Sequence, residues 1–173
     1  MALTQNENPP AYSPQDLFEN LVHGDGTRIW VARTKSRQEK QLAHTLNTHQ
    51  IPYFLPMIKR PQQSQKRLRM SLLPLFPGYL FFWGGLLERE KALKTGKVAQ
   101  ILEVDDQQRI NNELQQVNLL LKQENDVELC DFLRRGKKIR ITDGPFAGLT
   151  RIVQKRRNKT MLVLQVEEIR QSI

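Results

Sequence analysis

The pattern of apolar and polar positions predicts a series of short strands and helices in the first two thirds of the chain. Three apolar runs suit β-strands, at residues 29–32, 53–55 and 79–83. Between the first two runs, Ser36-Arg37-Gln38-Glu39 matches a capping box, which predicts a helix to about His49. The polar and basic segment 59–69 alternates only weakly, so we interpret it as a protruding hairpin or loop.

Two helices and one further strand are predicted after the aromatic run. Residues 86–95 suit a helix that ends at Gly96, a residue type common just after helices, and residues 98–104 suit a strand. Asp105 or Asp106 can cap the last helix. The apolar positions of that helix recur at helical spacing: Ile110, Leu114, Val117 and Leu121.

The predicted order β-α-β-(β)-β-α-β-α indicates an α/β sandwich over residues 27–124, with helices packed against a mostly antiparallel sheet. The polar segment 125–135 is interpreted as a linker. Beyond it the pattern is all β, with strands predicted at 137–141, 149–154 and 160–166. Short, twisted strands close naturally into a small β-barrel, which we assign to residues 136–173.

Residues 1–26 are interpreted as a flexible leader. Prolines 9, 10 and 14 interrupt any early element, whereas Ser13-Pro14 offers an N-cap followed by a proline at the first helical position. Leu17, Phe18 and Leu21 would share one face of the short helix that follows. Such a helix could dock on the body or on a partner, or stay mobile.

Basic residues are gathered in two blocks, and the net charge of the whole chain is +9. Residues 27–69 hold ten Lys or Arg against Glu39 alone, residues 131–173 hold eleven against four acids, and residues 1–26 hold four acids and no base. Two basic blocks around a mildly acidic middle are expected of a protein that meets phosphate with two surfaces. A solvated surface without a nucleic-acid ligand is the alternative interpretation.

Enzymatic chemistry has little support in the sequence. His44 and His49 are five residues apart, about 140° around a helix, and so cannot share a metal ion. Neither of the two common phosphate-binding loop patterns is present. Cys130 is the single cysteine, and no apolar run is long enough to span a membrane. We therefore expect a soluble, cytoplasmic protein that is not an enzyme and that needs no cofactor or metal.

Two segments are too specific to serve only as scaffold. The first, Pro74-Leu75-Phe76-Pro77-Gly78-Tyr79-Leu80-Phe81-Phe82-Trp83, places aromatic residues on both faces of one strand. A core explains one of these faces, and the other needs a covering helix or a binding partner. The second segment, Asp143-Gly144-Pro145-Phe146-Ala147-Gly148, predicts a tight turn that displays Phe146 at the end of a strand.

In this order, the two segments resemble the NusG family of transcription factors. Members of this family have an N-terminal α/β domain with a PLFPGYLF-like stretch. A small barrel, the KOW domain, follows and opens with the pattern G-x-x-V-x-I-x-D-G-P-F-A-G. Here the second pattern is Gly136-Lys137-Lys138-Ile139-Arg140-Ile141-Thr142-Asp143-Gly144-Pro145-Phe146-Ala147-Gly148. The resemblance covers residues 28–170, approximately, and indicates a specialised paralogue that suppresses pausing or termination at particular operons.

The resemblance also implies partners and sites, on a protein expected to be a monomer. The N-terminal domain would bind the clamp helices of RNA polymerase through an apolar pocket formed by Tyr79, Phe81 and Ile101. The KOW domain would use Phe146 to recruit a small-subunit ribosomal protein or the terminator Rho, or would recruit neither. Upstream or non-template DNA would meet a set of basic residues through its phosphates: Lys35, Arg37, Arg60, Lys66, Arg67 and Arg69.

The sequence departs from the family pattern at both domains. Arg33 stands where relatives often have an aromatic residue, and Ile29-Trp30 stands where Trp-Tyr is usual. The sequence stops at Ile173, where the family begins its fourth barrel strand, so we expect the closing strands of the barrel to be missing. The alternative function is that of a KOW-containing RNA-binding or ribosome-associated protein, which would have no use for an aromatic polymerase pocket.

Overall fold

The computed structural model describes residues 8–20, 26–64, 67–122, 137–140, 150–156 and 159–163. The chain divides into two compact units, residues 1–108 and 109–173. Sequence patterning had placed the whole of the last helix in the first domain, whereas this boundary falls inside that helix, α4 (Gln107–Lys122).

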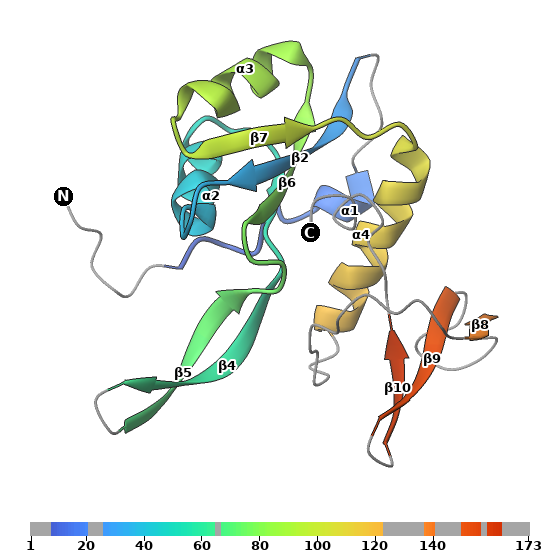
Figure 1. Ribbon diagram of the computed structural model, residues 1–173. Coiled ribbons are helices and arrows are strands. Elements are labelled where there is room, and N and C mark those ends of the chain that lie inside the picture. The colour runs from blue at the N-terminus through green and yellow to red at the C-terminus, as the bar shows by residue number, and fades with distance from the viewer. Residues whose placement is uncertain are drawn as a thin grey trace. The chain divides into compact units, whose positions relative to one another are not determined.

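The first unit is built on a five-stranded sheet in the order β1-β3-β6-β2-β7, in which every neighbouring pair is antiparallel (Figure 1). Its helices and strands confirm the predicted α/β class. In chain order they are β1 (Tyr12–Ser13), α1 (Leu17–Asn20), β2 (Arg28–Thr34), α2 (Glu39–Thr48), β3 (Tyr53–Phe54), β4 (Met57–Ser64), β5 (Arg67–Pro74), β6 (Tyr79–Gly84), α3 (Leu86–Lys94) and β7 (Val98–Leu102).

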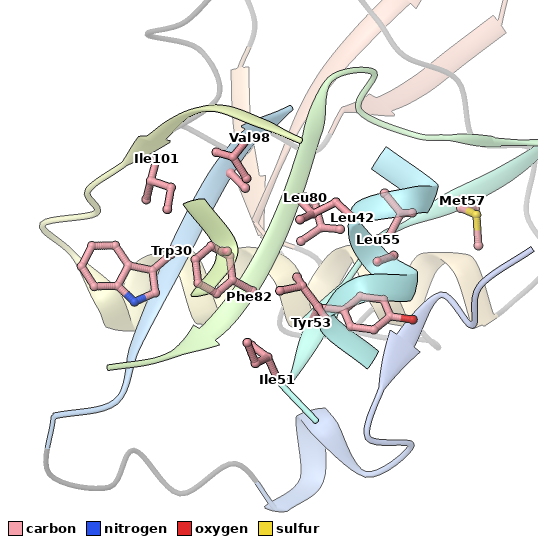
Figure 2. Packing of buried hydrophobic residues seen from close by; sticks show 14 residues of the cluster. Trp30, Leu42, Ile51, Tyr53, Leu55, Met57, Leu80, Phe82, Val98 and Ile101 are labelled. Carbon is pink, nitrogen blue, oxygen red and sulfur yellow. The ribbon is translucent and has the colours of Figure 1, made fainter. Parts of the chain in front are cut away.

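One face of the sheet packs against α2 and α3 and forms the hydrophobic core shown in Figure 2. Trp30 of β2 and Leu80 and Phe82 of β6 point into this cluster because successive strand residues face opposite sides of a sheet. Helix α2 buries Leu42 and Leu46 there, at the spacing of one helical turn. We call this side the helix-covered face.

Helix α2 begins differently from the prediction. The N-cap residue is Gln38, which makes no capping hydrogen bond through its side chain, so the expected capping box from Ser36 to Glu39 is wrong. Ser36 is exposed, and the Glu39 carboxylate accepts a hydrogen bond from the backbone N–H of Gly78 instead. The Glu39 carboxylate therefore makes a tertiary hydrogen bond and does not cap the N-terminus of its own helix.

Strands β4 and β5 form a separate two-stranded hairpin that projects from the sheet (Figure 1). Their antiparallel register runs from Met57 paired with Pro74 to Ser64 paired with Arg67. Of the two interpretations of segment 59–69, a hairpin or a loop, the structure confirms the hairpin. The hairpin leaves the sheet where β3 ends and returns where β6 begins.

Part of the expected leader is built into the sheet. Ser13 is the last residue of the edge strand β1, and α1 begins four residues later at Leu17, so Ser13 does not cap that helix. The pairing of Tyr12 with Phe54 joins β1 to β3. Residues 12–18 therefore contribute to the packing of the first unit.

The second unit contains a three-stranded antiparallel sheet in the order β10-β9-β8. Its strands are β8 (Lys137–Arg140), β9 (Thr150–Arg156) and β10 (Lys159–Val163), close to the three predicted strands. The 143–148 turn, with Phe146, lies outside the described residues. Closure of these strands into a barrel stays a prediction.

Candidate functional site

The face of the sheet opposite α2 and α3 is lined by aromatic side chains. In the pairing of β2 with β6, Val31 lies opposite Phe81 and Ile29 opposite Trp83, and Phe54 of β3 flanks Phe81 on the other side. Directly paired residues share a face of the sheet, so these five side chains lie together. We call this surface the aromatic face.

The structure brings together two of the three residues expected to form one pocket. Tyr79 and Phe81 alternate along β6 and share the aromatic face. Ile101 of β7 pairs with Ala32 and belongs to the hydrophobic cluster on the helix-covered face, where Figure 2 shows it near Trp30. The sheet itself separates Ile101 from Tyr79 and Phe81, so the three do not line a common pocket.

Tyr79 and Phe81 are also covered by other parts of the chain. Tyr79 is 5% exposed, and Phe81 has no exposed surface. The ring of Phe81 lies 6.1 Å from that of Phe76, edge-on, and 6.4 Å from that of Phe54. In the described arrangement Phe81 is a core side chain, and a partner can reach its ring only if something that covers it moves.

Residues of the leader complete the aromatic face. The ring of Phe18 in α1 lies edge-on to Phe54 at 5.0 Å and to Trp83 at 6.0 Å. Tyr12 contacts both Phe18 and Phe54 by the same edge-on geometry. The sequence places Phe18 on the apolar face of a short helix but gives no partner for it. The strand at 79–83 carries aromatic residues on both faces, and this pattern indicates that a second element covers it.

The turn at Pro77-Gly78 fixes where the aromatic strand begins. Gly78 has φ +85°, in the left-handed region that favours glycine. Its N–H donates to the Glu39 carboxylate at 2.7 Å, and its carbonyl accepts from the Thr34 N–H at 2.8 Å. These two bonds give the Pro-Gly pair a structural role, because they set the register of β6 against β2.

Three of the predicted basic residues lie in two places. Lys35 and Arg37 are exposed in the loop after β2, whereas Arg60 is half-buried on β4 of the hairpin, paired in register with Ser71. Among the described residues, none of these three side chains takes part in an ion pair. Unpaired cations on an exposed surface are available to phosphate.

The remaining predicted bases lie on or beside the hairpin. Arg67 pairs in register with Ser64, and Arg69 pairs with Gln62. Alternate positions of a paired hairpin share a face, so positions 60, 67 and 69 fall on the same face of the two strands. Lys66 lies outside the described residues.

Two kinds of site can be assessed only within the described ranges. There, no group of three or more His, Cys, Asp or Glu side chains is arranged to hold a metal ion. The helices described for this chain are also too short or too polar to cross a membrane.

Comparison with known proteins gives the family. No curated protein matches the chain. The family model described as transcription termination factor nusG matches residues 29–120, more than half of the chain. The matched segment begins in β2 and ends in α4, so it contains the helix-covered face, the hairpin and the aromatic strand. The chain therefore belongs to the NusG family of transcription factors, whose members are not enzymes and interact with RNA polymerase.

Proposed function

We propose that this chain is a transcription elongation and antitermination factor that binds the clamp of RNA polymerase through residues 27–124. By bridging the polymerase around its nucleic acids, it suppresses pausing or termination, and it does so in the cytoplasm at particular operons. The observation that carries the proposal is the family match over residues 29–120, which coincides with this domain.

The arrangement of charge supports contact with the nucleic acid of the elongation complex. Lys35 and Arg37 lie in the loop after β2, and Arg60 lies on the hairpin, which projects from the sheet (Figure 1). Such residues bind phosphates in any sequence, so they position the protein on upstream or non-template DNA without reading bases. Specificity for particular operons then requires base contacts or a second partner.

The aromatic face supports the apolar part of the polymerase contact. Tyr79 and Phe81 share it, together with Phe54 and Trp83, and large aromatic side chains dominate the binding energy of protein interfaces. Ile101 is left out of this contact because it lies on the helix-covered face. Polymerase binding through Phe81 then requires that the aromatic face be uncovered first.

The C-terminal unit is the basis of a second candidate function. Residues 131–173 hold eleven Lys or Arg against four acids and include three antiparallel strands, which also suits an RNA-binding or ribosome-associated KOW protein. In the proposed antiterminator, the same unit with Phe146 recruits a small-subunit ribosomal protein or Rho, or recruits neither. The two functions differ in the macromolecule that the purified chain retains.

A single-round transcription assay tests the proposed function. Purified RNA polymerase is stalled, released on a template with a strong pause site, and followed in time with and without the full chain. We expect the chain to shorten the pause or to increase read-through of a terminator. A variant with Lys35, Arg37 and Arg60 replaced by Gln should act more weakly, whereas Lys94→Gln on α3 should act as the unmodified chain does. If both pausing and read-through stay unchanged at a saturating concentration of the chain, the proposed function is refuted.

A further inference from the structure

The leader is attached to the edge of the sheet mainly through its backbone. The Leu55 N–H donates to the Ala11 carbonyl at 2.6 Å, and the Tyr53 hydroxyl donates to the Pro10 carbonyl at 3.0 Å. With the pairing of β1 and β3, these bonds add an extended segment to a free sheet edge. This is the way in which many proteins bind a peptide from a separate chain.

The side chains of the leader then close over the aromatic face. Leu17 is 1% exposed, and the Phe18 ring stands edge-on between Phe54 and Trp83. Edge-on aromatic pairs of this spacing are favourable beyond the area they bury. The leader therefore occupies the same side of β6 that carries Tyr79 and Phe81.

The cover leaves one polar group of the aromatic face unsatisfied. Trp83 is 1% exposed, and its indole Nε1–H has no hydrogen-bond acceptor among the described residues. The other tryptophan, Trp30, donates its indole N–H to the Gly84 carbonyl at 2.9 Å. A buried donor without an acceptor costs free energy. A partner that presents an acceptor to the Trp83 indole would recover this free energy, whereas the leader does not.

The strand and the helix of the leader are short. Strand β1 has two residues and α1 has four, and elements of this length are not stable without tertiary contacts. One further bond ties the segment down, since the Lys40 ammonium donates both to the Asn8 side chain and to the Leu72 carbonyl of β5, each at 2.6 Å. Lys40 thus joins the leader to the base of the hairpin.

We propose that residues 8–20 are an intramolecular competitor for the polymerase contact: they occupy the aromatic face, and docking of the polymerase clamp displaces them. The inference rests on the proposed function, because it takes the aromatic face as the polymerase-binding surface. The displacing partner is an apolar polypeptide segment that also presents an acceptor to the Trp83 indole. Apparent affinity is lower than intrinsic affinity by the fraction of chains in which the leader is undocked.

The first test compares the full chain with its Phe18→Ala variant, and with Gln15→Ala as a matched control on an exposed leader position. Exchange of the Leu55 amide, which donates to Ala11, reports leader docking without polymerase. We expect Phe18→Ala to speed this exchange and to raise polymerase affinity about tenfold, because removal of a packed ring favours the undocked state. Gln15→Ala should change neither.

The outcomes separate this inference from the proposed function. If Phe18→Ala frees the Leu55 amide while affinity stays at the level of the unmodified chain, the leader is not a competitor, although polymerase binding itself stands. If neither chain binds polymerase, the proposed function fails and the inference fails with it.

A second measurement needs no variant. Hydrogen exchange of the unmodified full chain, followed by mass spectrometry, is compared before and after addition of polymerase. We expect exchange to increase in residues 8–20, because the leader leaves as the clamp arrives. Equal or stronger protection of residues 8–20 in the complex would overturn the inference.

Discussion

The Glu39 carboxylate accepts a hydrogen bond from the backbone N–H of Gly78, with 2.7 Å between Oε1 and N. Glu39 is the first residue of α2 and is buried, whereas Gly78 lies in the turn before β6. The bond therefore joins helix α2 to the entry of the aromatic strand, across 39 positions of sequence. The bond holds the start of α2 against the turn before β6.

Replacement of Glu39 by Ala should destabilise the first unit. The Gly78 N–H then loses its acceptor, and a part-buried donor left unsatisfied costs about 1 kcal/mol, at the lower end of the range for buried groups. Urea unfolding followed by circular dichroism measures this change. Glu39→Gln, which keeps an oxygen acceptor, should lose less. Glu90→Ala, at an exposed position of α3, should change the free energy of unfolding by about 0.5 kcal/mol or less. Equal losses for Glu39→Ala and Glu90→Ala would contradict the role assigned to this bond.

Phe81→Ala should unfold or strongly destabilise the domain. The side chain has no exposed surface and contacts Phe54 and Phe76, so truncation should cost about 3–5 kcal/mol. A thermal melt of the variant beside that of Leu86→Ala, a mostly exposed position, measures the difference. A cooperative melt at the unmodified temperature would contradict the core position of Phe81.

The stability of the chain should fall at alkaline pH because of Tyr53. Burial raises the pKa of the Tyr53 hydroxyl from its ordinary value near 10 to about 12. Between these values the folded chain holds a proton that the unfolded chain has lost, so folding stability is complete below pH 10 and declines as pH rises towards 12. Urea unfolding from pH 9 upwards should show the decline.

Tyr53→Phe provides the control for this prediction. The variant loses the bond to the Pro10 carbonyl and should start slightly less stable, but the decline between pH 10 and 12 should be reduced. An identical decline in both chains would mean that the loss of stability has another source.

Much of residues 27–122 could be predicted because the elements there follow simple repeats of apolar positions. The predicted strand at Tyr79, the helix at Leu86 and the helix containing Ile110 each begin within about two residues of their observed starts. The hairpin was recognised as a possibility because of its polar composition. The periodicity of apolar residues is sufficient to predict a helix or strand that buries one regular side.

The contacts of the leader and of Ile101 could not be predicted in the same way. Strand β1 is only two residues long, too short to show a period, and Phe18 finds its place through tertiary packing against Phe54 and Trp83. Ile101 was grouped with Tyr79 by family resemblance. Only the register of β7 against β2 shows that it faces the other side of the sheet.

Neutralising Lys35, Arg37 and Arg60 should weaken binding to elongation complexes. With Lys35, Arg37 and Arg60 replaced by Gln, the slope of log affinity against log salt should fall by roughly one for each phosphate contact removed. Fluorescence anisotropy at several salt concentrations measures it. Lys94→Gln on α3 is the matched loss of one charge. An unchanged slope in the triple variant would mean that these bases only solvate the surface.

The hairpin bases are tested separately. A variant with Lys66, Arg67 and Arg69 replaced by Gln should also lower the salt slope if the projecting hairpin follows DNA beyond the sheet. The comparison of the two triple variants then tells whether phosphate contacts extend to residues 66–69 of the hairpin.

The most direct test of the polymerase proposal is to ask which macromolecule the full chain retains. The purified, tagged chain is incubated with equal amounts of RNA polymerase elongation complexes and ribosomes and is recovered in physiological salt. The protein subunits and RNA of the bound fraction are then identified. We predict recovery of the polymerase subunits at a one-to-one ratio with the chain, with or without ribosomal RNA beside them. Recovery of ribosomal RNA and no polymerase would contradict the account and would favour the ribosome-associated alternative.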